Sequence, residues 1–114
     1  MREFADVASV ADVPAGELLG VTMPDGVAVC LYNRNGEIGA VSDVCTHAEF
    51  AMSSGVLHAD GTIECVWHGA QFDCRTGAVR RQPATEALLV FDVRVEGDRV
   101  LVAAAASDSG TRNP

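Results

Sequence analysis

Two short segments of this chain each place a cysteine close to a histidine, and they constrain its fold more than any other feature. Cys45 and His47 stand in "CTHAEF", and Cys65 and His68 stand in "CVWHG". A cysteine and a histidine two or three positions apart in a loop can bind one metal centre from a single turn. Two such loops supply two thiolates and two imidazoles, so the fold has to bring the loops together.

A structural zinc ion is one interpretation of this donor set, because Zn²⁺ accepts two thiolates and two imidazoles. Zinc fingers of this ligand type usually place both histidines on one helix. Here each histidine follows its own cysteine, in sequence rich in β-forming residues. A zinc-stabilised structural or interaction domain therefore stays open as an alternative, while the two matched pairs disfavour four unrelated core residues.

The chain has four cysteines, and two of them share loops with the histidines. Its first residues show no apolar run after a basic start, and no stretch approaches the roughly 18–20 apolar residues of a membrane span. We therefore expect a cytoplasmic protein that does not bind a membrane, in a compartment where thiols stay reduced. Metal binding then outranks disulfide bonding, and Cys30 and Cys74 are expected to be ordinary buried or half-buried thiols.

The composition is acidic, with 16 acidic residues against 8 basic ones and a formal net charge of −8. This charge disfavours binding to the phosphates of nucleic acids. It favours a partner with a basic docking face, or it serves solubility alone. Arg75, Arg80 and Arg81 form a local basic cluster, which is either part of a docking surface or a solvated face.

Apolar segments separated by turn residues predict an all-β fold. Residues 17–22, 27–33 and 37–43 are predicted strands joined through "MPDG" and "NRNG", and residues 87–95 and 99–104 are a predicted closing hairpin across "EGD". Glycine and asparagine tolerate positive φ in such turns, and proline fixes its own φ. These outer strands predict an antiparallel base of sandwich or barrel type.

The length of 114 residues, 48% of them hydrophobic, is that of one domain with a single core. We expect this domain to cover residues 1–104 and the remaining residues 105–114 to form a flexible tail. Between about residues 43 and 83 the chain changes to short strands and many loops. That pattern is typical of a small inserted subdomain that carries a site.

Residues 55–65 form a predicted hairpin within this insertion. It turns at residues 59–61, "ADG", and returns the chain so that Cys65 ends beside Cys45. His58 falls in the turn and is expected to be exposed.

The chain resembles Rieske-type [2Fe–2S] proteins through these motifs. "CTH" and "CVWHG" match the two cluster loops of that family in ligand order and spacing, and "FDCRTG" resembles the segment that follows them. The resemblance covers roughly residues 43–79, and the outer strands agree in pattern. It implies one Rieske-type cluster in which one iron is bound by two cysteines and the other by two histidines. The implied ligands are Cys45 and Cys65 for one iron, and His47 and His68 for the other.

Departures from the family pattern indicate a subtype. The respiratory and photosynthetic members carry an extra cysteine in each loop, and a serine and a tyrosine that donate hydrogen bonds to sulfur. This chain has Phe50 and Trp67 at the cysteine positions and Ala70 and Phe72 at the donor positions. It therefore resembles the low-potential Rieske ferredoxins that serve bacterial aromatic-ring-hydroxylating oxygenases.

The resemblance implies a one-electron carrier between a flavin-containing ferredoxin reductase and a terminal oxygenase. The histidine-bound iron would be the easier one to reduce, so His47 and His68 would form the exit route. An oxygenase would need a further iron bound by two histidines and a carboxylate. Of three histidines only His58 remains, so the chain is not expected to be an enzyme. Residues 82–84 stand where the family often has a proline-bearing loop over the cluster.

A protein like the small subunit of nitrite reductase, which has a related fold, is a further alternative. Many such subunits lack the four ligands, so the presence of these ligands here counts against it.

Overall fold

The computed structural model describes residues 4–44, 51–65, 69–81 and 88–106. The secondary structure of these described residues consists of short strands and two 3₁₀ helices. In chain order these are β1 (Phe4–Ser9), η1 (Val10–Asp12), β2 (Leu18–Thr22), β3 (Ala28–Arg34), β4 (Glu37–Ser42), η2 (Met52–Ser54), β5 (Val56–Leu57), β6 (Thr62–Glu64), β7 (Gln71–Asp73), β8 (Val79–Arg81), β9 (Val90–Glu96) and β10 (Arg99–Ala106).

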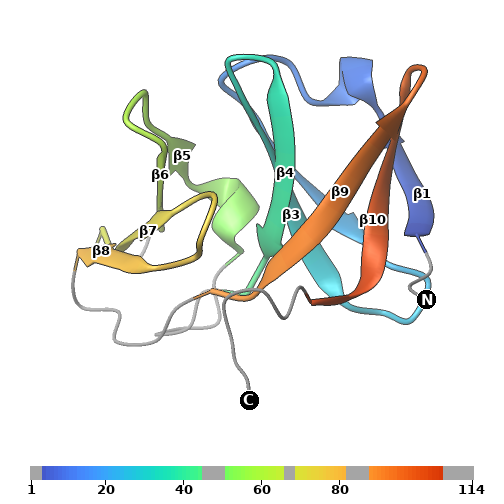
Figure 1. Cartoon of the computed structure of the whole chain (residues 1–114). Coiled ribbons are helices and arrows are strands. Elements are labelled where there is room, and N and C mark those ends of the chain that lie inside the picture. The colour runs from blue at the N-terminus through green and yellow to red at the C-terminus, as the bar shows by residue number, and fades with distance from the viewer. Residues whose placement is uncertain (1–3, 45–50, 66–68, 82–87, 107–114) are drawn as a thin grey trace.

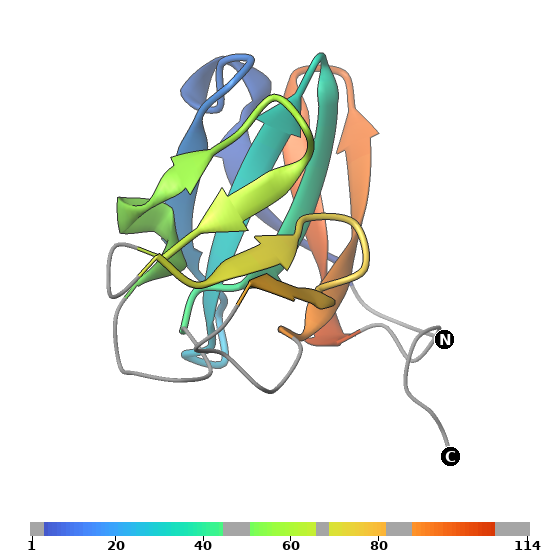
Figure 2. The ribbon, with the colours of Figure 1, turned by 90° about the vertical axis from the view of Figure 1, so that its left-hand side faces the viewer.

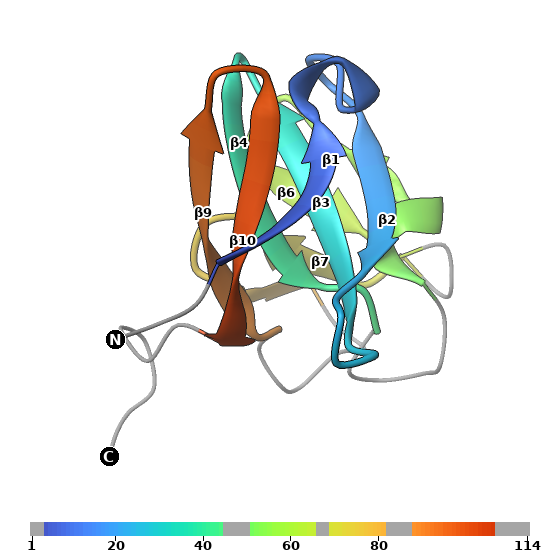
Figure 3. The ribbon, with the colours of Figure 1, turned by 90° about the vertical axis from the view of Figure 1, so that its right-hand side faces the viewer.

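The strands form two antiparallel sheets that lie side by side (Figure 1). The larger one, here called the base sheet, has the order β1-β10-β9-β4-β3-β2 and is strongly curled, as Figure 3 shows. The small sheet has the order β5-β6-β7-β8 and faces the viewer in Figure 2. It is inserted between β4 and β9 of the base sheet. The predicted all-β fold, a base of sandwich or barrel type with a small inserted subdomain, is confirmed.

The turn between β3 and β4 shows how local sequence sets the register of the base sheet. Asn35 and Gly36 have φ angles of 57° and 95°, as a two-residue hairpin of the Asn-Gly type requires. The register that follows pairs Arg34 with Glu37 and continues to Val29 opposite Ser42. The segment "NRNG" predicted this turn. The register that the turn sets determines which face of each strand is buried.

Strand β3 separates two cores because its side chains alternate between the faces of the base sheet. Val29 and Leu31 belong to the base core, which lies inside the curled sheet, and Cys30 and Tyr32 belong to the inter-sheet core. The base core consists of Ala8, Val13, Met23, Val29, Leu31, Ala40, Phe91, Val100 and Val102. The inter-sheet core consists of Cys30, Tyr32, Val41, Met52, Ile63, Cys65, Ala70, Phe72, Cys74 and Leu88. The inter-sheet core thus fixes the small sheet against the base.

Strand β1 was not predicted. It pairs with β10 at the other end of the chain, with a register shift between Asp6 and Ala8. Arg99 of β10 binds the Asp6 carboxylate, with Nη2 2.8 Å from Oδ1. Strand β1 lies at the edge of the base sheet, and its apolar and polar residues alternate only weakly. Its strand structure therefore depends on pairing with β10 more than on its own sequence.

The C-terminal strand is longer than expected. β10 continues to Ala106, which pairs with Phe91 after a register shift. Residues 105 and 106, which were expected to belong to a flexible tail, are part of β10, whose backbone is still paired with β9 there. Residues 107–114 lie outside the described part of the chain. No helix among the described residues has the length and apolar character that a membrane-spanning helix needs.

Candidate metal centre

Of the four predicted ligands, the structure describes Cys65. Cys45, His47 and His68 lie outside the described residues, as do Phe50, Trp67 and residues 82–84. The structure does describe the residues that directly precede and follow each of the two loops. Their contacts define how the two ligand loops begin and end.

The residues on either side of the first loop, residues 45–50, meet at one place, here called the first neck. Val44 and Ala51 form an isolated antiparallel bridge, and the N–H of Met52 donates to the carbonyl of Asp43 at 2.7 Å. The Asp43 carboxylate also accepts from the N–H of Ser53 at 2.6 Å and from its hydroxyl at 3.0 Å. Asp43 therefore clamps the two ends of the segment that carries Cys45 and His47.

The second loop begins and ends at a second neck, formed by Cys65 and Ala70. The N–H of Cys65 donates to the carbonyl of Ala70 at 2.8 Å, and Glu64 pairs with Gln71 between β6 and β7. The loop that carries His68 is therefore closed at its base by main-chain hydrogen bonds, and Cys65 is held at the start of it.

The two necks lie beside each other. A Cβ atom on Gly55 would overlap the carbonyl oxygen of Glu64, so the chain that leaves the first neck packs directly on the residue before Cys65. Met52 and Cys65 are both fully buried in the inter-sheet core. This arrangement supports the prediction that the hairpin over residues 55–65 brings Cys65 beside Cys45, whose own position stays a prediction.

The environment of Cys65 fits a metal-bound thiolate. Its side chain is fully buried, in a core that also contains Ile63, Ala70 and Phe72. A thiolate in such apolar surroundings needs a cation to balance its charge. The described donor and its neighbours therefore fit an iron–sulfur cluster or another thiolate-bound metal.

The two remaining cysteines lie outside the two predicted ligand loops, Cys30 on β3 and Cys74 directly after β7. Burial raises the pKa of the Cys30 thiol far above its usual range, and the nearby Asp43 carboxylate adds to this effect. Burial also raises the pKa of the Cys74 thiol, although a hydrogen bond with Tyr32 opposes it. Both side chains stay protonated at neutral pH, and the expectation that both are buried is confirmed.

His58 is more enclosed than expected. Its side chain is 38% exposed and its Nε2 lies 2.6 Å from Oε1 of Glu64. The turn residue was expected to be exposed, but the pairing of β5 with β6 directs its ring onto the carboxylate. Neither this contact nor the clamp by Asp43 was predicted, because each depends on a strand register that residue types alone do not reveal.

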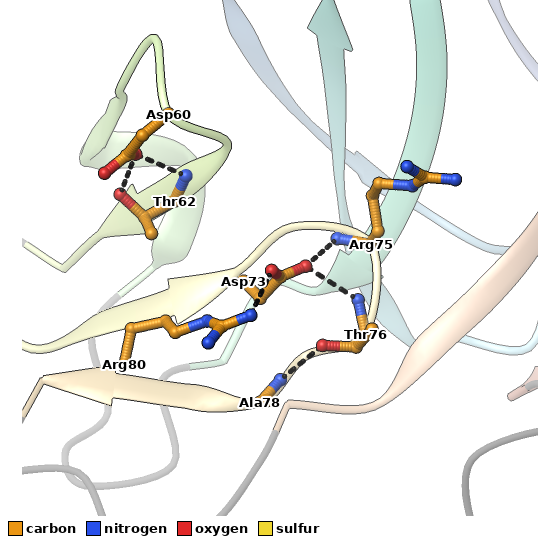
Figure 4. A network of polar contacts seen from close by, with 7 residues as sticks. All are labelled: Asp60, Thr62, Asp73, Arg75, Thr76, Ala78 and Arg80. Carbon is orange, nitrogen blue, oxygen red and sulfur yellow. Dashed lines mark hydrogen bonds and ion pairs between the residues drawn. The ribbon is translucent and has the colours of Figure 1, made fainter.

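The arginine cluster is partly neutralised within the β7–β8 hairpin (Figure 4). Asp73 accepts from the main-chain N–H groups of Arg75 and Thr76 at 2.9 and 3.1 Å, and from Nη2 of Arg80 at 2.8 Å. Burial works to raise the pKa of Asp73, but the hydrogen bonds from Arg80 and the two N–H groups outweigh it and hold the pKa below its usual value. The Arg75 side chain points away from Asp73 and is exposed.

A second carboxylate stabilises the neighbouring hairpin in the same way. Oδ1 of Asp60 accepts from the N–H of Thr62 at 3.0 Å and from its hydroxyl at 2.7 Å (Figure 4). These bonds lower the pKa of Asp60. The predicted turn at residues 59–61 is thereby fixed, and it directs β6 toward Cys65.

Comparison with known proteins identifies the class to which this fold and site belong. The sequence model of the Rieske [2Fe-2S] domain matches residues 3–102, so the chain belongs to the Rieske [2Fe–2S] family. Its cofactor is accordingly one Rieske-type [2Fe–2S] cluster. The resemblance stated from the two motifs is confirmed, and a zinc-stabilised domain is not favoured.

Within the family, the chain is similar to ferredoxins of dioxygenase systems. It is 42% identical over 94 residues to the 3-phenylpropionate/cinnamic acid dioxygenase ferredoxin subunit of Shigella boydii serotype 4 (strain Sb227), which covers 82% of this chain and 86% of that protein. The solved ferredoxin of carbazole 1,9a-dioxygenase from Nocardioides aromaticivorans IC177 matches with a TM-score of 0.81 and 34% identity, over 88% of this chain and 96% of that one.

A third match comes from a complex of reduced oxygenase and oxidized ferredoxin in carbazole 1,9a-dioxygenase. It has a TM-score of 0.85 and 30% identity, and it covers 91% of this chain and 95% of the matched chain. These relatives are electron-transfer components, and the chain is a Rieske ferredoxin of the same kind rather than a catalytic enzyme. The expectation of a one-electron carrier is confirmed.

Proposed function

We propose that this protein carries single electrons from a flavin-containing ferredoxin reductase to a terminal aromatic-ring-hydroxylating oxygenase. The observation that carries the proposal is the placement of the two necks, which sets the start of the second ligand loop beside the ends of the first. Membership of the Rieske family implies that the cofactor is a [2Fe–2S] cluster. The proposed ligands are Cys45 and Cys65 for one iron, and His47 and His68 for the other.

When bound, the cluster takes up and releases one electron. The chain's own residues hold and shield it. Cys65 is buried between the sheets, which keeps water away from its sulfur atom. Asp43 and Ala70 close the two loops at their bases, so the proposed ligands are held by main-chain geometry on both sides.

The oxygenase partner is supported by the relative that was solved in complex with an oxygenase. The reductase partner follows from the resemblance to low-potential ferredoxins. We propose the cytoplasm as the place of action. We propose that both partners dock where His47 and His68 lie. The net charge of −8 favours a partner with a basic face.

The test of the carrier function combines composition with kinetics. Purified protein should contain two iron atoms and two acid-labile sulfides per chain, since that is the content of one [2Fe–2S] cluster. Chemically reduced protein should be reoxidised when it is mixed with an oxidised oxygenase. The rate of reoxidation should rise in proportion to the concentration of the oxygenase. A colourless protein that contains zinc, or a reduced protein that the oxygenase does not reoxidise, would contradict the proposal.

Docking by charge is tested separately by salt. Attraction between charged surfaces acts mainly on the association rate and is screened over about 8–10 Å at ordinary ionic strength. The second-order rate of reoxidation should therefore fall as salt is raised. A rate that does not change with salt would refute the role of charge and leave the carrier function intact.

A further inference from the structure

Glu64 joins three segments at the base of the second ligand loop. It is the last residue of β6 and directly precedes Cys65. Its Oε1 atom lies 2.6 Å from Nε2 of His58, in the β5–β6 turn, and accepts a hydrogen bond of 3.3 Å from Nε2 of Gln71 on β7. The carboxylate is thus held from both neighbouring segments at the point where the loop leaves the sheet.

The other oxygen of the same carboxylate faces the returning end of the loop. A Cβ atom on Gly69 would come 3.3 Å from Oε2 of Glu64, and Gly69 has a φ angle of 72°. Gly69 directly follows His68 in the chain. The carboxylate therefore lies against the main chain of Gly69, which follows the proposed ligand His68, and Glu64 itself directly precedes the proposed ligand Cys65.

The charge of this carboxylate is only partly exposed to water. The Glu64 side chain is 31% exposed, and a partly buried charge is screened less by salt than a fully exposed one. The sequence alone did not predict a role for Glu64, because a glutamate at the end of a strand is commonly a solvated residue. Its position depends on the pairing of β6 with both β5 and β7.

We infer that Glu64 is a positioning residue of the iron–sulfur centre, whose carboxylate fixes the second loop and lowers the reduction potential by placing a negative charge beside that loop. The inference rests on the proposed ligands, Cys65 and His68. Reduction adds one negative charge to the centre, so a fixed negative charge nearby disfavours the reduced state. The hydrogen bonds to His58 and Gln71 keep that charge in place.

The experiment measures the reduction potential of the cluster-loaded protein by voltammetry, with iron and sulfide content matched among variants. Glu64→Gln removes the charge and keeps a side chain of the same shape that can hydrogen-bond. It should shift the ratio of reduced to oxidised protein at a fixed electrode potential by about tenfold toward the reduced form, which is about 59 mV for one electron. Glu96→Gln is the matched control, because Glu96 is an exposed carboxylate at the far end of β9 and the same charge is lost.

Gln71→Lys provides a second variant that keeps the glutamate. It places a positive charge within reach of the Glu64 carboxylate, so it should raise the potential without removing the support of the loop. Potentials raised in both variants, with Glu96→Gln unchanged, would support the inference. Both potentials equal to that of the wild type would overturn it and leave the carrier function standing, since a purely structural role changes cluster content but not the potential. A wild type that lacks iron and sulfide would overturn both proposals.

Discussion

The backbone of Gly77, in the β7–β8 turn, packs directly on the backbone of Leu88, which leads into β9. The N–H of Leu88 donates to the carbonyl of Gly77 at 2.8 Å, and a Cβ atom on residue 77 would overlap the carbonyl oxygen of Leu88. This contact ties the small sheet to the base sheet near the start of β9.

Gly77→Ala should therefore destabilise the protein. Residue 77 has a φ angle of 75°, which costs a residue with a side chain about 1–2 kcal/mol, and the overlap with Leu88 adds to that cost. Gly16→Ala is the matched control, since Gly16 has a φ angle of 86° with open space around it. Urea unfolding should show a larger loss of stability for Gly77→Ala than for Gly16→Ala. Equal losses would mean that the contact with Leu88 contributes nothing.

Of the three described cysteines, we expect Cys65 to be a cluster ligand and Cys30 and Cys74 not to be ligands. Cys65→Ser should lose the cluster, because a hydroxyl group replaces a thiolate poorly as a ligand of iron. Cys30→Ala and Cys74→Ala should retain it, since both residues lie outside the two predicted ligand loops and both thiols stay protonated. Iron and acid-labile sulfide per folded chain provide the measurement. A fully loaded Cys65→Ser protein would remove Cys65 from the proposed ligand set.

The stability contributed by Asp73 should depend on pH. Its pKa in the folded protein lies below the usual value, so the stabilisation is complete above about pH 4, the range where an unfolded aspartate titrates, and is lost as the pH falls through the folded pKa. We expect Asp73→Asn to be less stable than the wild type by about 1 kcal/mol at pH 6, because the asparagine makes weaker bonds to Arg75, Thr76 and Arg80.

Urea unfolding of both proteins between pH 6 and pH 3 gives the comparison. The difference in stability should shrink as the pH falls below about 4. Arg80→Gln should cost less than Asp73→Asn, because the Arg80 side chain is 54% exposed and exposed ion pairs contribute little. A difference between wild type and Asp73→Asn that stays constant over the whole range would show that the charge of Asp73 is not what stabilises the turn.

The sequence predicted those features that depend on local residue types. Asn35 and Gly36 fix their turn by themselves, and the spacing of Cys65 and His68 predicts a ligand loop from residue types alone. β1 could not be predicted, since its pairing with β10 spans the whole chain. The same holds for the contact of Glu64 with His58, because two residues on different segments meet only once the register of β5 and β6 is set.

The inter-sheet core also bears on the potential, through two residues that were singled out from the sequence. Ala70 and Phe72 are both fully buried, in the same core as Cys65. Neither side chain can donate a hydrogen bond, whereas the corresponding serine and tyrosine of the high-potential type do so. A donor to a cluster sulfur stabilises the reduced state more than the oxidised one, since the reduced state is the more negative. The potential should therefore lie near the low end of the Rieske range, roughly −150 mV.

Installing both donors, as Ala70→Ser with Phe72→Tyr, should raise this potential. A buried hydroxyl group needs a partner, and if each one favours the reduced cluster by about 1 kcal/mol, the pair should raise the potential by roughly 80 mV. Phe91→Tyr is the matched control, because Phe91 is buried in the base core and Cys65 belongs to the inter-sheet core. Voltammetry at matched cluster content is the measurement. A wild type well above zero, or a double variant that shifts no more than Phe91→Tyr, would refute the explanation of the low potential by missing donors.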